Sequence, residues 1–257
     1  MSREAKSQTI IFDLDGTAID SPDHQEPTQR LVAAIKAAEI RYNLCAATGR
    51  PWSSARPVLE ALHLLDPCIV SAGTQIRRAS NGEILWQCNI EPADLEAAVQ
   101  MIKQYPQYKV LYNDFTQETY FDGETMPLNN ALEMPTHALS ILFIPPAEAR
   151  GVMESFRHIP GIACTLALAQ KPGFNDLLVT NSKATKEQAI AKLLEILGTT
   201  PQNTIGIGDG HNDLHLFKAV GQKVAMGNAV EELKDAADLV IGSVSDDGLA
   251  KYLERLH

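Results

Sequence analysis

Residues 9–20 read TIIFDLDGTAID, and this stretch decides how the rest of the chain is interpreted. Three apolar residues, at positions 10–12, lead directly into two carboxylates, Asp13 and Asp15, which are separated by one leucine. The pattern is typical of a buried strand that ends in an acidic loop. Because an unpaired buried carboxylate is costly in free energy, we expect a compensating partner beside these acids.

The composition is that of a globular protein with excess negative charge. The 257 residues are 45% hydrophobic, which is enough for one large domain or two modest ones. The formal net charge is −10. Nucleic-acid backbones select basic surfaces, so this charge argues against a nucleic-acid partner. A site that is locally positive can still bind a small anion.

The sequence also predicts a cytoplasmic protein that does not contact a membrane. The N-terminal residues MSREAKSQT lack the apolar segment of a signal peptide, and no apolar run approaches the length of a membrane span. Cys45, Cys68, Cys88 and Cys164 are spaced neither as a CxxC pair nor as a zinc site. We therefore expect reduced thiols. No feature of the sequence indicates a particular oligomeric state.

Strands and helices alternate in the two outer parts of the chain, residues 1–80 and 183–257. In the first part the pattern predicts strands at 9–16, 41–49 and 67–73, with helices at 27–39 and 53–65. In the second part it predicts a helix at 186–198, a strand at 204–210, and then shorter helices and strands. Such alternation favours an α/β fold with a doubly wound, mostly parallel sheet.

The pattern changes between residues 81 and 182. Helices are expected at 94–105 and 147–159, and strands at 83–90, 108–114, 118–123, 137–144, 163–169 and 176–180. The strands at 108–114 and 118–123 read as a hairpin around Phe115, Thr116 and Gln117. Paired strands mixed with two helices indicate an inserted α+β unit.

Four polar clusters fall at predicted strand ends or at a helix start. They are Asp13-Leu14-Asp15-Gly16-Thr17, Thr48-Gly49-Arg50, residues 183–186, and Gly208-Asp209-Gly210-His211-Asn212-Asp213. In open α/β sheets, ligands bind at the carboxyl ends of the strands, so we expect these clusters to converge. Carboxylates gathered in one place repel one another unless a divalent cation joins them, and oxygen-only ligands suit Mg²⁺.

This set of residues predicts chemistry on a phosphate ester. A carboxylate beside Mg²⁺ and a lysine can attack phosphorus. A second acid two residues later can protonate the leaving oxygen and then deprotonate water. Thr48 and the backbone N–H groups near Gly16 and Gly49 can bind the phosphate oxygens.

Together the motifs resemble those of the haloacid dehalogenase (HAD) superfamily. The last part is similar to its Cof-type (subfamily IIB) phosphatases, because GDGHND is followed by AMGNA at 225–229, an Ala-Asp pair at 237–238 and an Asp-Gly pair at 247–248. The resemblance covers residues 9–80 and 183–255. It implies a catalytic core in residues 1–80 and 183–257, with a substrate-selecting cap at 81–182. It also implies Mg²⁺-dependent hydrolysis of a small phosphate monoester, such as a sugar phosphate, through an aspartyl-phosphate.

The resemblance assigns a role to each motif residue. Asp13 matches the nucleophile and Asp15 the general acid and base. The metal ligands would be Asp13, the backbone carbonyl of Asp15, and Asp209. Asp213 matches an accessory acid near the metal. The phosphate-binding residues would be Thr48, Gly49, Arg50, Lys186 and Asn212.

Some alternatives stay open at this point. Lys186 fits the phosphate lysine best, because the family's lysine opens the helix that leads to the GDG strand, but Lys183 is a rival. Thr48 can instead cap the next helix. Ala72-Gly73 stands where the branch usually has Asn-Gly, so the role of that asparagine is either lost or supplied elsewhere, for example by Ser71 or Thr74. The alternative activity is that of a sugar phosphomutase, and a phospho-acceptor signalling module is a third reading.

Overall fold

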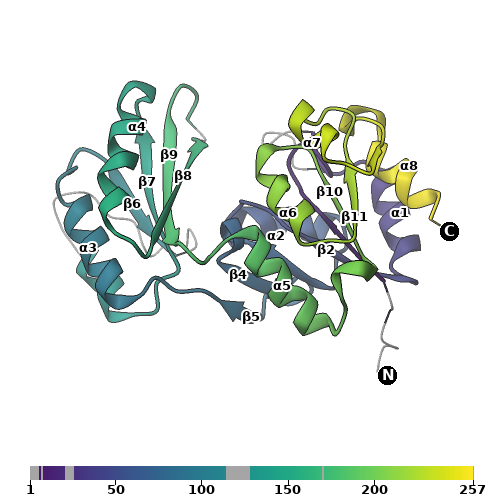
Figure 1. The fold of residues 1–257 in the computed structure, drawn as a ribbon, viewed down its shortest axis with the longest axis horizontal. Coiled ribbons are helices and arrows are strands. Elements are labelled where there is room, and N and C mark those ends of the chain that lie inside the picture. The colour runs from purple at the N-terminus through teal and green to yellow at the C-terminus, as the bar shows by residue number, and fades with distance from the viewer. Residues whose placement is uncertain (1–5, 7, 21–25, 114–127, 170, 257) are drawn as a thin grey trace. The chain divides into compact units, whose positions relative to one another are not determined.

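The structure is a computed structural model that describes residues 6, 8–20, 26–113, 128–169 and 171–256 (Figure 1). It contains two compact units. The first, here called the core unit, combines Met1–Trp86 with Thr185–His257, and the second, the inserted unit, is Gln87–Ala184. The chain thus leaves the core unit after Trp86 and returns to it at Thr185. The sequence pattern puts these two boundaries after residues 80 and 182.

The core unit is built on a parallel sheet in the strand order β12-β11-β10-β1-β2. Its strands are β1 (Gln8–Phe12), β2 (Tyr42–Ala46), β10 (Thr204–Gly208), β11 (Gln222–Ala225) and β12 (Leu239–Val240). Its α-helices are α1 (Gln29–Ala38), α2 (Trp52–Ala61), α5 (Lys186–Leu197), α6 (Leu214–Lys218), α7 (Glu231–Asp235) and α8 (Gly248–Glu254). The predicted α/β class with a mostly parallel sheet is therefore confirmed.

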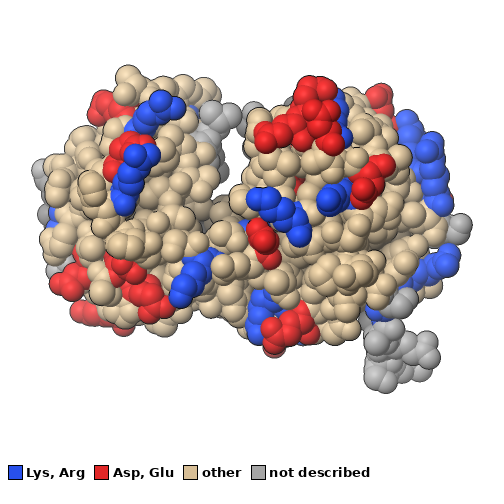
Figure 2. Space-filling model, viewed as in Figure 1, with Lys and Arg blue, Asp and Glu red and all other residues tan. Residues whose placement is uncertain are grey.

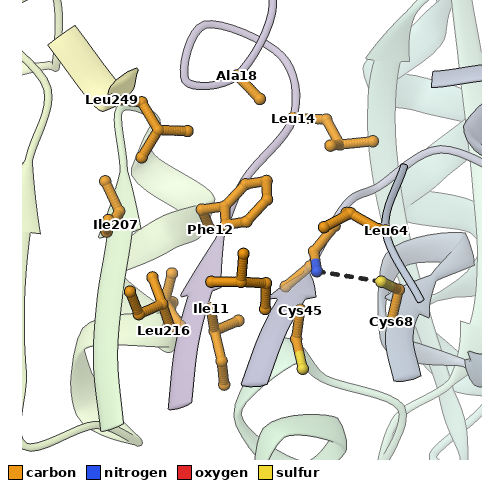
Figure 3. Packing of buried hydrophobic residues seen from close by; sticks show 14 of the residues in the cluster. Ile11, Phe12, Leu14, Ala18, Cys45, Leu64, Cys68, Ile207, Leu216 and Leu249 are labelled. Atoms are coloured by element: carbon orange, nitrogen blue, oxygen red, sulfur yellow. Dashed lines mark hydrogen bonds between the residues drawn. The ribbon is translucent and has the colours of Figure 1, made fainter. Parts of the chain in front are cut away.

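Strand β1 lies inside this sheet, between β10 and β2, and its burial explains its apolar sequence. Ile10, Ile11 and Phe12 are fully buried, as is usual for strands covered on both faces. In Figure 3, Ile11 and Phe12 lie between Ile207 and Leu216 on one side and Cys45 on the other. The neighbours of β1 come from both halves of the chain, because it pairs with β2 and with β10.

Three further strands form an antiparallel sheet in the order β3-β4-β5. They are β3 (Pro67–Val70), β4 (Gln75–Arg78) and β5 (Ile84–Gln87). The backbone N–H of Thr48 donates to Ile69 O at 3.0 Å, which connects β3 to the end of β2. The sequence pattern did not indicate β4, because this strand is short and carries two arginines.

In its described residues, the inserted unit has a four-stranded antiparallel sheet in the order β6-β7-β9-β8 and two α-helices. Leu95 and Val99 from α3 pack in one cluster with Leu139, Ile141 and Leu177 from the sheet. The expected strand at 118–123 and the turn at 115–117 lie outside the described residues. The elements are β6 (Lys109–Tyr112), β7 (Ala138–Ile144), β8 (Ile162–Leu168), β9 (Asn175–Asn181), α3 (Pro92–Ile102) and α4 (Pro146–Ser155).

Short 3₁₀ helices complete the described structure. Two of them border the polar clusters, η1 (Ser71–Gly73) after β3 and η5 (His211–Asp213) after β10. The others are η2 (Leu128–Glu133), η3 (Phe156–His158), η4 (Pro201–Asn203) and η6 (Val244–Asp246).

Exposed acids gather over one helix of the core unit. Figure 2 shows carboxylates gathered over α7, where Glu231 and Glu232 are exposed. Lys234 pairs with Glu231 at 2.8 Å, so this face is a solvated helix surface. Within the described ranges, the helices are too short or too polar to cross a lipid bilayer.

Candidate active site

A buried lysine joins two carboxylates at the end of the central strands. Lys186 Nζ donates to Asp13 Oδ1 and to Asp213 Oδ1, each at 2.7 Å. Asp13 is the first residue after β1, and Lys186 is the first residue of α5. Their exposed fractions are 5% and 6%, and that of Asp213 is 0%. An ammonium group is therefore fixed between two acids that water hardly reaches.

The loop after β10 closes against the loop after β1. Thr17 Oγ1 donates to Asp209 Oδ1 at 2.8 Å. The backbone N–H groups of Asp209 and Gly210 both donate to Asp213 Oδ2 at 3.0 Å. These bonds hold the Asp209 and Asp213 carboxylates beside Asp13, so that oxygens of all three acids lie within 4.8 Å of one another.

The three clustered acids fit a divalent cation. Their three formal negative charges face the single positive charge of Lys186. Burial is the main cause that raises the pKa of Asp13 to about 7, against the lowering effect of Lys186. Burial likewise raises the pKa of Asp209 to about 6. Such acids favour a proton or a cation, and hard carboxylate oxygens are the ligands that Mg²⁺ prefers. Asp213, expected only as an accessory acid, supplies the third carboxylate.

These pKa shifts predict that the metal-free protein loses stability as the pH rises from about 4 to 7. In that interval folded Asp13 still binds a proton that the unfolded chain, with an ordinary pKa of 3.8, has lost. Ionisation of Asp13 therefore costs folding free energy, and the loss is complete above pH 7. The thermal midpoint in EDTA should be lower at pH 8 than at pH 5, and Mg²⁺ should raise it more at pH 8.

The Asp13→Asn variant is the control for that experiment, because it removes the group that titrates. Its midpoint in EDTA should depend less on pH than the midpoint of the natural protein. The opposite result would contradict the predicted sign. In it, the thermal midpoint of the natural protein in EDTA would rise between pH 5 and pH 8 relative to that of Asp13→Asn.

Asp15 lies outside this cluster and pairs with Arg50. Arg50 Nε donates to Asp15 Oδ2 at 2.9 Å, and Nη2 donates to Oδ1 at 2.6 Å. Both carboxylate oxygens of Asp15 are thus occupied by one guanidinium group. The sequence placed Arg50 among the phosphate ligands, whereas its side chain here binds the expected general acid and base.

The other expected phosphate ligands differ in their surroundings. Thr48 is 1% exposed, and its hydroxyl accepts from the backbone N–H of Arg50 at 3.1 Å. It does not cap α2, because the N-cap residue of that helix is Pro51. The backbone at Gly49 is open, since an added Cβ would meet no atom within 4 Å. Asn212 is exposed in η5.

Lys183, the rival to Lys186, belongs to the inserted unit. Its side chain is exposed, and its backbone N–H donates to Asn181 Oδ1 at 2.8 Å. Lys186 is the lysine whose ammonium group contacts Asp13.

Two polar side chains that support the site were not assigned from the sequence. Thr17 holds Asp209, as described above. Asn228 Nδ2 donates to Gly16 O at 2.8 Å, and its Oδ1 accepts from Val244 N at 2.9 Å. Asn228 therefore ties the acidic loop to the segment before α8. The sequence signal that could have identified Asn228 is its place in the AMGNA motif at residues 225–229.

Gly16 is required by both its conformation and its surroundings. Its φ is +79°, which favours glycine, and a Cβ at this position would collide with the carboxylate of Asp209. Gly16→Ala is therefore expected to displace Asp209, to lower activity at least about tenfold, and to cost about 1 kcal/mol or more of stability.

Gly198→Ala is the matched control for Gly16→Ala. Gly198 also has a positive φ, +65°, but an added Cβ there would meet nothing within 4 Å. This control should lose a similar amount of stability, measured by urea unfolding, and should keep its activity. Full activity in Gly16→Ala would show that Asp209 tolerates displacement.

The Ala72-Gly73 pair adopts the left-handed conformation, with φ of 55° and 96°. An asparagine tolerates this conformation better than an alanine, which gives a physical reason for the asparagine that the branch usually has. Ser71 and Thr74, the proposed replacements, are buried, and Thr74 Oγ1 donates to Ser71 O at 2.9 Å. A Cβ on Gly73 would lie 2.8 Å from the carbonyl carbon of Thr185, so this turn supports the start of α5.

Comparisons with known proteins cover almost the whole chain. A family model described as haloacid dehalogenase-like hydrolase matches residues 10–253. YkrA of Bacillus subtilis (strain 168) is 44% identical over 264 residues, which cover 97% of this chain and 98% of that protein. A second protein of that bacterium, named 5-amino-6-(5-phospho-D-ribitylamino)uracil phosphatase YcsE, is 38% identical over 95% of this chain and 93% of its own.

The fold also agrees with solved structures. The crystal structure of TM0651 from Thermotoga maritima matches with a TM-score of 0.80, over 98% of this chain and 98% of that one, at 20% sequence identity. At this level of identity the likeness concerns the fold alone.

Proposed function

The chain belongs to the haloacid dehalogenase-like hydrolase family, and we propose that it hydrolyses a small phosphate monoester, such as a sugar phosphate, through phospho-Asp13 with Mg²⁺ as cofactor. The predicted family and enzyme class, a phosphoric monoester hydrolase, are confirmed by the family model and the full-length relatives. The observation that carries the proposed chemistry is the bridge from Lys186 to Asp13 and Asp213, with Asp209 in the same cluster.

In the first half of the reaction, an Asp13 carboxylate oxygen attacks phosphorus and the bond from phosphorus to the ester oxygen breaks. Asp15, protonated at this stage, gives its proton to the departing oxygen, which leaves as an alcohol. Lys186 offsets the negative charge that the two anions bring together. The product of this half is an acyl phosphate on Asp13.

In the second half, the Asp15 carboxylate takes a proton from water, and the water oxygen attacks the same phosphorus. The bond from phosphorus to Asp13 then breaks and inorganic phosphate leaves. Asp13 is again a carboxylate and Asp15 is again protonated, so the cycle is closed.

The side chains of Asp13, Asp209 and Asp213, with the backbone carbonyl of Asp15, would hold the Mg²⁺ ion. When bound, the ion supplies positive charge that neutralises the phosphate and the crowded acids. Lys186, the Thr48 hydroxyl, the backbone N–H of Gly49 and the Asn212 amide are the groups that we expect to bind the phosphate oxygens. We also propose a cytoplasmic location, which the four free cysteines support because thiols stay reduced in that compartment. Cell fractionation tests this location.

A screen of small phosphate esters tests the proposed function. The panel should include sugar phosphates and 5-amino-6-(5-phospho-D-ribitylamino)uracil, for which the relative YcsE is named. Release of inorganic phosphate with Mg²⁺, and its loss in EDTA, is the expected result. Conversion of a sugar phosphate into its isomer without phosphate release would favour the phosphomutase alternative. A panel with no Mg²⁺-dependent turnover would count against both.

A further inference from the structure

We propose that Arg50 is a positioning residue for Asp15, which it holds by two parallel hydrogen bonds, and that it is not a ligand of the substrate's phosphate. This inference rests on the proposed function, in which Asp15 transfers the proton in both halves of the reaction. It changes the role that the sequence motif suggested for Arg50.

The geometry of Arg50 shows that the guanidinium is held at several points. Nε and Nη2 face the two oxygens of Asp15, at 2.9 and 2.6 Å, and Nη1 points to Ser54 O at 3.4 Å. Its backbone is fixed too, because Arg50 N donates to Thr48 Oγ1 and Arg50 O accepts from Ser71 N at 2.7 Å. The side chain is 10% exposed. The Nε and Nη2 groups that face Asp15 are therefore preorganised before any substrate binds.

Arg50 has two edges that can bind a carboxylate or a phosphate through parallel N–H groups, and both are engaged by the protein. Asp15 occupies the Nε and Nη2 edge, and on the other edge Nη1 is directed at Ser54 O. A phosphate could bind at the Nε and Nη2 edge only by displacing Asp15, which would remove the proton-transfer group from its partner. The positive charge beside Asp13 is supplied by Lys186 instead.

The two bonds from Arg50 orient the carboxylate of Asp15, a partly exposed residue. Its side chain is 31% exposed, and the next residue is Gly16, at a φ of +79° in the loop. A carboxylate on such a loop can rotate toward water, whereas two bonds to one planar group define both its direction and its plane. Misplacement of a catalytic group by about 1 Å can cost roughly a hundredfold in rate.

Substitution of Arg50 separates positioning from phosphate binding. In Arg50→Ala and Arg50→Lys, kcat should fall about 10- to 100-fold, while KM and the inhibition constant of inorganic phosphate stay within about twofold. Lysine keeps the positive charge but lacks the two parallel N–H groups of a guanidinium, so Arg50→Lys should not rescue kcat. Arg56→Ala is the control, because it breaks the exposed Arg56–Glu60 pair on α2 and should leave both constants unchanged.

Two results would overturn the proposal. One is a tenfold or larger rise in KM and in the phosphate inhibition constant with kcat retained, and the other is wild-type kcat in Arg50→Lys. The lysine variant also covers the case in which Arg50→Ala fails to fold.

A second measurement does not depend on activity. The stabilities of the natural protein, Asp15→Ala, Arg50→Ala and the double variant are compared by urea unfolding in EDTA. If the loss of unfolding free energy in the double variant differs from the sum of the losses in the two single variants, the Asp15–Arg50 pair is supported. If the losses add, the proposal is overturned, even when the enzyme is active. If no phosphate ester is hydrolysed, the proposed function fails, but this cycle still reports whether Arg50 holds Asp15.

Discussion

Replacement of Asp13 by asparagine is expected to abolish turnover while the fold stays intact. An amide has the shape of the carboxylate but cannot attack phosphorus, so we expect a loss of at least about a thousandfold in kcat. Labelling of the protein with radioactive phosphate from substrate should disappear with it. The chain should stay folded because Asp13 is buried with an elevated pKa, so removal of its charge relieves a desolvation cost.

The measurements for Asp13→Asn are phosphate release, radiolabel incorporation and the thermal midpoint in EDTA. Asp235→Asn is the control, because it makes the same chemical change at an exposed residue that ends α7 and is not one of the three clustered acids. Residual activity above a few per cent of the natural protein would mean that another group attacks phosphorus.

Replacement of Lys186 by methionine should have the second largest effect. Methionine replaces the aliphatic part of the lysine side chain but leaves Asp13 and Asp213 buried without their shared cation. Removal of one partner from a buried ion pair typically costs about 3–5 kcal/mol. We expect a loss of that order in urea unfolding and at least about a hundredfold loss in kcat.

Lys183→Met provides the comparison, since Lys183 is exposed and belongs to the inserted unit. It should keep its stability and change kcat less than about twofold. Mg²⁺ should restore little activity to Lys186→Met, because the ion does not replace the N–H donors of the lysine. Loss of activity in the Lys183 variant alone would show that the motif is aligned one helical turn away.

Much of the core unit could be predicted because its signals are local. The apolar run before Asp13 and the one before Asp209 each define a buried strand, and parallel strands bring their carboxyl ends to one edge. Lys186 could be placed because it opens the helix expected at 186–198, as the family's lysine does. In the structure Thr185 caps this helix, with its hydroxyl 3.2 Å from Gln188 N. Convergence of Asp13, Lys186 and Asp213 follows from these placements.

Contacts between loops could not be predicted in this way. The bond from Thr17 to Asp209 joins residues 192 positions apart, and the bond from Asn228 to Gly16 joins residues 212 positions apart. Both depend on loop conformations that hydrophobic periodicity does not encode. The partner of Arg50 was missed for a related reason, because a guanidinium group fits a carboxylate and a phosphate equally well.

The position of β1 between β2 and β10 has a consequence for synthesis on the ribosome. β2 emerges soon after β1, but β10, the other neighbour of β1, follows only after the whole inserted unit. Until then one edge of β1 is open, and an open apolar strand edge can pair with another chain. Nascent chains stopped before residue 204 should therefore aggregate through β1 and bind no Mg²⁺, whereas the full-length chain should stay dispersed and bind the ion.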